Sequence, residues 1–92
     1  MRDKNFILNS IKMDLHRIAT ASGDISKPLP IQSIKEFLEH AQNDFNKIET
    51  TPLEETLKNQ LISLSKSLED LKDLNKRLIW TEDILTIRCR MS

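Results

Sequence analysis

Leucine recurs every seventh residue in the C-terminal half of the chain, at positions 57, 64, 71, 78 and 85. Leu61 and Leu68 lie three or four residues from these positions, so a helix over this stretch carries a nearly continuous apolar stripe. The rest of the chain also favours helices, because it has one glycine, no tyrosine and few aromatic residues. We therefore expect an all-α fold, with residues 1–92 forming a single domain.

Capping residues and prolines predict the ends of the first two helices. Asn5 can cap the start of a helix over 5–22, and Gly23 can take the left-handed conformation that ends it. Two prolines make the segment 23–30 an expected loop. A second helix over 31–49 follows, with apolar residues in strict three-four alternation at Ile31, Ile34, Leu38, Ala41, Phe45 and Ile48.

The start of a third helix has several signals that agree. Thr51 can cap it, Pro52 suits its first position, and Glu54 completes the spacing of a capping box. So few residues separate it from the second helix that the two must form an antiparallel hairpin. We expect this third helix to cover 52–90, since neither glycine nor proline interrupts it. A fresh helix start at Trp80–Asp83 is the alternative, because a threonine there precedes two acids.

The third helix is too long for the second helix to cover. At 1.5 Å per residue the two would be about 57 Å and about 28 Å long. Apolar residues also lie on two sides of the last part of the third helix. We therefore expect a homodimer in which a second copy completes the helical bundle. The expected interaction surface consists of Leu71, Leu74, Leu78, Trp80, Ile84, Leu85, Ile87 and Met91.

The leucine heptad resembles that of basic leucine-zipper proteins, in which a basic segment precedes the zipper and enters the major groove of DNA. In this chain the preceding residues, 49–55, are acidic and include a proline. That departure removes the DNA-binding half of the family pattern. Leu74 and Ile79 also stand where a two-stranded coil would have charged residues, which favours a bundle over an isolated zipper.

One set of residues has spacing suited to a metal ion. Glu36, His40 and Asp44 follow one another at intervals of four, so they share one face of the second helix. A solvated face with mild charge pairing is the simpler interpretation, because helical di-metal proteins use several Glu-x-x-His sites. The sequence has neither a nucleophile–base signature nor a glycine-rich phosphate loop, so we expect a protein that is not an enzyme and needs no cofactor.

Charge and cysteine content narrow the class of protein further. Basic and acidic residues balance at fourteen each, which disfavours nucleic acid as a partner. A weak nucleic-acid surface remains an alternative, at Lys72, Lys76, Arg77, Arg88 and Arg90. Cys89 has no second cysteine to pair with, and we expect its side chain to be at least half-buried.

These observations predict a protein-interaction module, such as a scaffold, adaptor, chaperone or immunity-type protein. The N-terminal residues lack the uninterrupted apolar run of a secretory signal, and no segment approaches the roughly 20 apolar residues that cross a bilayer. We therefore expect a cytoplasmic protein that binds a second copy of itself or another protein. His16 is expected on the surface.

Overall fold

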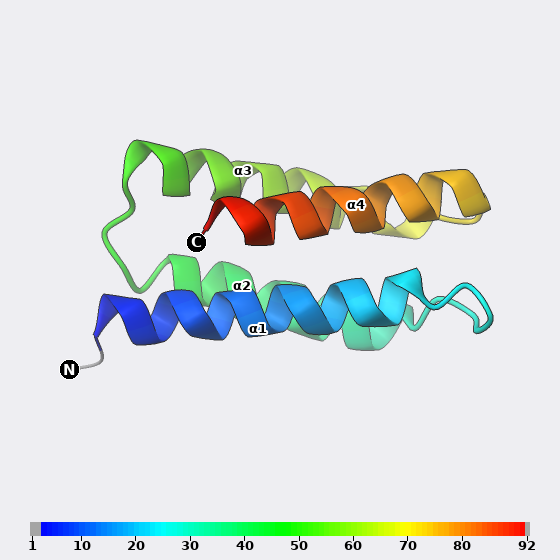
Figure 1. Cartoon of the computed structure of the whole chain (residues 1–92), viewed down its shortest axis with the longest axis horizontal. Coiled ribbons are helices and arrows are strands. Elements are labelled where there is room, and N and C mark those ends of the chain that lie inside the picture. Colours follow the sequence, from blue (N-terminus) through cyan, green and yellow to red (C-terminus); the bar gives the residue numbers. More distant parts are fainter. Residues whose placement is uncertain (1–2, 92) are drawn as a thin grey trace.

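The computed structural model describes residues 3–91, which form four α-helices and one short 3₁₀ helix, without a strand. Each helix runs antiparallel to the one before it, and the first two helices form one layer beneath the last two (Figure 1). The fold is all-α, as expected, but the prediction of three helices is wrong. The elements are α1 (Lys4–Gly23), α2 (Ile31–Phe45), α3 (Pro52–Lys66), η1 (Leu68–Asp70) and α4 (Leu74–Arg90).

The expected helix over 52–90 is broken between α3 and α4. The hydroxyl of Ser67 donates a hydrogen bond to the carbonyl oxygen of Leu64 at 3.0 Å, and its own backbone N–H bonds to the same oxygen. Asp73 then caps α4, its carboxylate accepting from the N–H of Asn75 at 2.9 Å. Serine and aspartate side chains compete with helical backbone bonds in this way. The chain therefore turns back here without a glycine or a proline.

Buried side chains hold this turn against the rest of the bundle. Leu68 and Leu71 are almost fully buried, and the indole N–H of Trp80 donates to the carbonyl oxygen of Leu64 at 2.9 Å. The hydrogen bond joins α4 to the last turn of α3. Helix α4 itself continues without interruption through Trp80–Asp83.

Helix α4 supplies the cover that a second copy was expected to provide. Trp80, Ile84 and Ile87 are 3%, 0% and 2% exposed within the single chain. The length mismatch also disappears, because α2 and α3 each have 15 residues. The prediction that dimerisation completes the bundle is therefore wrong.

The ends of α1 differ from those predicted. Asp3, rather than Asn5, caps the helix by accepting from the N–H of Asn5. Gly23 is its last helical residue and has no positive φ, so a left-handed glycine does not end it. The buried side chain of Arg77 binds the end instead, because its guanidinium donates to the carbonyl oxygens of Ser22, Asp24 and Lys27 at 2.7, 2.7 and 3.0 Å. A cation at this position also suits the negative end of the helix.

The connection between α2 and α3 is longer than expected, since α2 ends at Phe45 rather than at residue 49. Lys4 holds this segment to the start of α1, donating to the carbonyl oxygen of Glu49 and pairing with the carboxylate of Glu54, both at 2.8 Å. The predicted capping box is confirmed, because Thr51 and Glu54 exchange hydrogen bonds with each other's backbone N–H.

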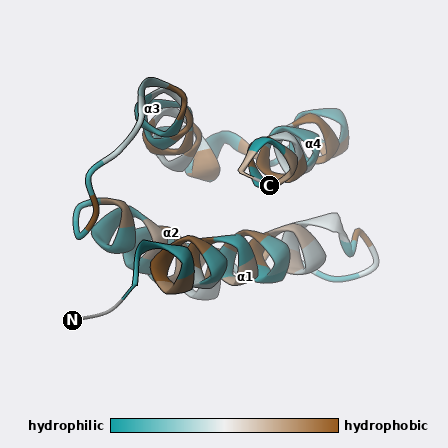
Figure 2. Ribbon diagram, turned by 60° about the vertical axis from the view of Figure 1, so that its left-hand side comes forward, coloured by the Kyte–Doolittle hydropathy of each residue, from teal (hydrophilic) through white to brown (hydrophobic). Residues whose placement is uncertain are grey.

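The core lies between the two layers, where the apolar sides of the helices face one another (Figure 2). Helix α1 packs closely on both α2 and α4, whereas α3 packs more loosely on its neighbours. Only Leu57 and Leu61 are fully buried in α3. Within residues 3–91, no helix combines the length and the apolar character needed to cross a bilayer.

Candidate functional site

A polar cluster joins α1 to α2 along one edge of the core. Asp14 of α1 and Asp44 of α2 are only 3% and 4% exposed, whereas the His40 side chain between them is 56% exposed. The Nδ1–H of His40 donates to Oδ2 of Asp14 at 2.5 Å and lies 3.6 Å from Oδ2 of Asp44. Aspartate is rarely buried unless it is paired. The pairing with His40 thus accounts for two buried carboxylates at a helix interface.

Further side chains balance the charge of the two carboxylates. Ser10 donates to Oδ2 of Asp44 at 3.0 Å, and Nζ of Lys47 lies 3.2 Å from Oδ1 of the same residue. The guanidinium of Arg17 lies 3.6 Å from Oδ1 of Asp14. The hydrogen bond to Asp14, together with the charge of that carboxylate, raises the pKa of His40 above its ordinary value. The imidazolium form of His40 is therefore more stable, relative to the neutral form, than in an unperturbed histidine.

The same cluster has donor atoms suitable for a cation. One donor atom from each of Asp14, His40 and Asp44 lies within 4.8 Å of the others. A zinc ion sits about 2.0–2.2 Å from nitrogen and oxygen ligands, so it would fit between them once the contact between His40 and Asp14 lengthened. Such an ion would have to displace the positive charges of Lys47 and Arg17 from these carboxylates.

The metal trio expected from the sequence included Glu36, which is exposed and lies outside this cluster. The third donor comes instead from Asp14 on another helix. One sequence signal could have found it, because Asp14 is seven residues after Ile7 and four before Ile18, within the apolar pattern of α1. A carboxylate at such a position points toward a neighbouring helix.

The residues of the expected interaction surface divide into two groups. Leu71, Trp80, Ile84 and Ile87 are buried in the core of the same chain, and Met91 packs partly against it. Leu74, Leu78 and Leu85 are exposed, at 49%, 38% and 39%. Because the chain turns before α4, the heptad leucines face the core before α4 and face solvent within it. Leu57 and Leu71 are buried, whereas Leu78 and Leu85, in the same repeat, face solvent.

Other residues singled out in the sequence have different surroundings. His16 is on the surface, as predicted, but Cys89 is exposed rather than half-buried. Arg77, one of the five residues of the weak basic patch, is buried and hydrogen-bonded to three carbonyl oxygens. The five residues therefore do not form one exposed basic patch.

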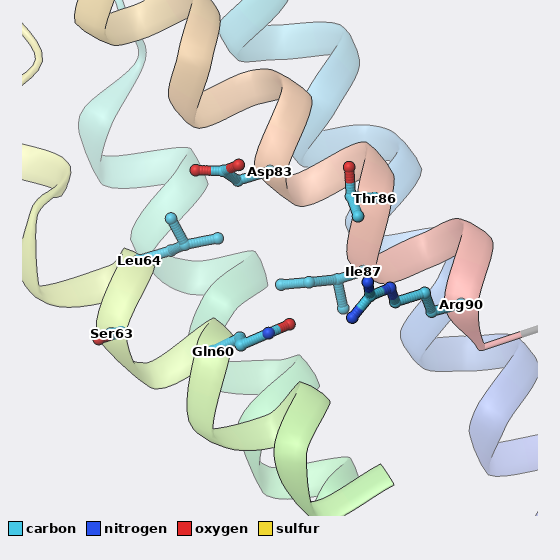
Figure 3. A pocket seen from close by; sticks show the side chains of 7 residues that line it. All are labelled: Gln60, Ser63, Leu64, Asp83, Thr86, Ile87 and Arg90. Carbon is cyan, nitrogen blue, oxygen red and sulfur yellow. The ribbon is translucent and has the colours of Figure 1, made fainter. Parts of the chain in front are cut away.

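A shallow groove of about 330 Å³ lies between α3 and α4. Gln60 and Leu64 of α3 face Ile87 and Arg90 of α4 across it (Figure 3). Its lining residues include neither histidine nor cysteine, and Asp83 is the one carboxylate among them. This lining has no nucleophile–base pair of the kind that covalent catalysis uses.

No family model, curated protein or solved structure matches this chain.

Proposed function

We propose that the protein is a non-enzymatic protein-interaction module that binds another chain through an exposed apolar stripe on α4. The observation that supports this proposal is the exposure of Leu74, Leu78 and Leu85, which lie outside a core that is already complete. Spacings of four and seven residues place them on one face of the helix. We define these three residues as the α4 stripe.

The α4 stripe is independent of the face that folds the bundle. Trp80, Ile84 and Ile87 occupy the buried face of α4, so this helix is apolar on two sides. Contiguous apolar side chains on a surface are typical of sites that bind another protein. Helix-in-groove recognition uses anchor residues at this spacing. The proposal assigns such a role to the stripe and places the protein in the cytoplasm.

The first partner to test is a second copy of the chain, because two-fold symmetric dimers are the commonest homo-oligomers. In this arrangement two complete bundles associate through their α4 stripes. Light scattering after size exclusion should give a dimer mass that falls to the monomer mass in the double variant Leu78→Asp, Leu85→Asp. Ile79→Asp is the matched control, since Ile79 is 58% exposed and lies on another side of the same helix. A monomer at every concentration tested would contradict self-association.

A second candidate function is cation binding at Asp14, His40 and Asp44. The specific observation in its favour is that two helices bring three donor atoms within 4.8 Å of one another. Metal analysis of purified protein should then find a stoichiometric divalent ion that is lost in His40→Ala. His16→Ala is the control, because His16 lies outside the cluster. Protein that stays metal-free after incubation with zinc would exclude this function and leave the cluster as an ion-pair network.

A further inference from the structure

A second groove lies between α1 and the last turns of α4. Its volume is about 610 Å³. Its two sides come from helices far apart in the sequence, with Lys12, Met13, His16 and Arg17 on α1 and Arg88 and Cys89 on α4. Pockets of this size hold small organic ligands.

The groove is basic. Lys12, Arg17 and Arg88 line it, and the lining residues include neither aspartate nor glutamate. The guanidinium of Arg17 lies 3.6 Å from Asp14 and 5.9 Å from the ring centroid of Phe37 on α2. Lys12 and Arg88 therefore supply the unpaired positive charges of the groove. Lys12 and Arg88 make no hydrogen bond or ion pair with any side chain in residues 3–91. This contrasts with the cluster between α1 and α2, where every charge has a partner.

Arg88 has an unsatisfied donor beside the groove. Its Nε is the one buried side-chain nitrogen or oxygen within residues 3–91 that lacks a hydrogen-bond partner. Leaving a buried donor unpaired is costly, and more so when the group is charged. Arginine has a planar set of donors that matches the oxygens of a phosphate group. Arg88 as a whole is half-buried and its guanidinium finds no acceptor within residues 3–91, so a bound anion would supply one.

We propose that this groove binds a small phosphate monoester. The phosphate group lies between Lys12 and Arg88, and the organic part of the ligand lies along Met13 and Cys89. Met13 is 56% exposed and gives the groove an apolar wall that a bare phosphate ion would not use. This proposal does not rest on a role of the α4 stripe in self-association.

The test is an NMR titration of the full chain, followed through backbone amides at constant ionic strength. The probes are inorganic phosphate and phenyl phosphate, with sodium chloride as the reference salt. Phenyl phosphate should give saturable shifts at residues 9–17 and 87–91 and should bind more tightly than inorganic phosphate. Alkylation of Cys89 by the neutral reagent iodoacetamide should slow when phenyl phosphate is bound.

The matched variants are Arg88→Met and Arg90→Met. Both remove one positive charge from the end of α4, but Arg90 lines the α3–α4 groove instead. Arg88→Met should weaken phenyl phosphate binding at least about tenfold, as expected for a lost charge-assisted hydrogen bond. Arg90→Met should leave the affinity almost unchanged. If Arg88→Met does not fold by circular dichroism, Lys12→Met serves as the test variant and should weaken binding as well.

Three results would overturn the proposal. Shifts that do not saturate, or that chloride reproduces at equal ionic strength, would show only screening of the basic groove. Equal weakening by Arg88→Met and Arg90→Met would show a general charge effect without a site. If inorganic phosphate binds as tightly as phenyl phosphate, the apolar wall does not contribute to binding, and the ligand is not a phosphate monoester.

Discussion

Helices α1 and α2 pack closely along their length, whereas α3 and α4 touch each other only loosely and leave a groove of about 330 Å³ between them. A polar cluster around His40 also joins the first pair. In the second pair, α4 packs more closely on α1 than on α3. The hydroxyls of Ser22 and Thr81 share a buried hydrogen bond of 2.7 Å across that α1–α4 interface.

The difference shows that the α3–α4 hairpin is stabilised partly by contacts with α1 and partly by one long-range contact within it. Arg77 binds the carbonyl oxygens at the end of α1, and Trp80 binds the last turn of α3. Both side chains come from the first two turns of α4. The position of α4 therefore depends on a few long-range interactions, each of which can be removed separately.

Trp80 should be the most important of these residues. Replacing it with alanine removes a ring that is 3% exposed and also removes the hydrogen bond to Leu64. Trp80→Ala should lower the free energy of unfolding by about 3–5 kcal/mol, the usual cost of truncating a buried tryptophan. Urea unfolding followed by circular dichroism measures this change. Trp80→Phe keeps most of the apolar contact and should lose much less. If Trp80→Ala were nearly neutral, the second hairpin would not depend on this contact.

Arg77 should have the next largest effect. Arg77→Met keeps the apolar stem but leaves three carbonyl oxygens without their guanidinium donor. We expect a loss of about 1–3 kcal/mol, because unsatisfied buried polar groups cost that much. Amides in the loop 24–30 should also exchange faster with solvent.

The neighbouring Lys76 provides the control for Arg77. Its side chain is exposed, so Lys76→Met should change stability by no more than about 0.5 kcal/mol. Equal effects of the two variants would mean that the carbonyl contacts of Arg77 contribute little.

These long-range contacts also explain which parts of the fold the sequence predicted. The start of α3 was predictable because Thr51, Pro52 and Glu54 act within one turn of the helix. The turn between α3 and α4 has weaker local signals, namely Ser67 and Asp73, and it is completed by Trp80, sixteen residues away from its partner Leu64. The heptad spacing favoured one long helix, since leucines on both sides of the turn continue the same repeat.

The sequence predicted only part of the polar cluster of Asp14, His40 and Asp44, again because local contacts are predictable and long-range contacts are not. His40 and Asp44 share a helix, so their spacing alone indicates that they lie together. Asp14 is 26 residues from His40 in the sequence, and only the packing of α1 on α2 brings them into contact. The groove between α1 and α4 was not predictable at all, because its two sides meet only after α4 folds back.

Gly23, at the end of α1 and next to Thr81 of α4, is a position where a substitution should stabilise the protein rather than destabilise it. Gly23→Ala should stabilise the protein by about 0.5–1 kcal/mol, because alanine is favoured over glycine in a helix. An added Cβ would lie 3.5 Å from Cγ2 of Thr81, an ordinary van der Waals contact. Thermal or urea unfolding measures the change. A destabilised variant would instead indicate the left-handed glycine that the sequence predicted.

The smallest expected effect is a pH dependence of stability that arises from His40 and Asp14, at the contact between α1 and α2. Because the Asp14 carboxylate raises the pKa of His40 in the folded chain, the imidazolium contributes stability. That contribution is fully present below the unfolded pKa of about 6.5 and is lost as the pH rises through the higher folded value. Solvent screening keeps it small, since the His40 side chain is 56% exposed and faces Lys47 and Asp44 as well as Asp14.

The measurement is the free energy of unfolding of the wild type and of His40→Gln at a series of pH values above 5.5. Glutamine can still donate a hydrogen bond to Asp14 but cannot become charged. The wild type should be the more stable of the two at the acidic end, and the difference should shrink as the pH rises. An NMR titration of the imidazole should give a midpoint above that of an unperturbed histidine. Parallel pH profiles for the two proteins would show that the charge of His40 does not stabilise the contact between α1 and α2.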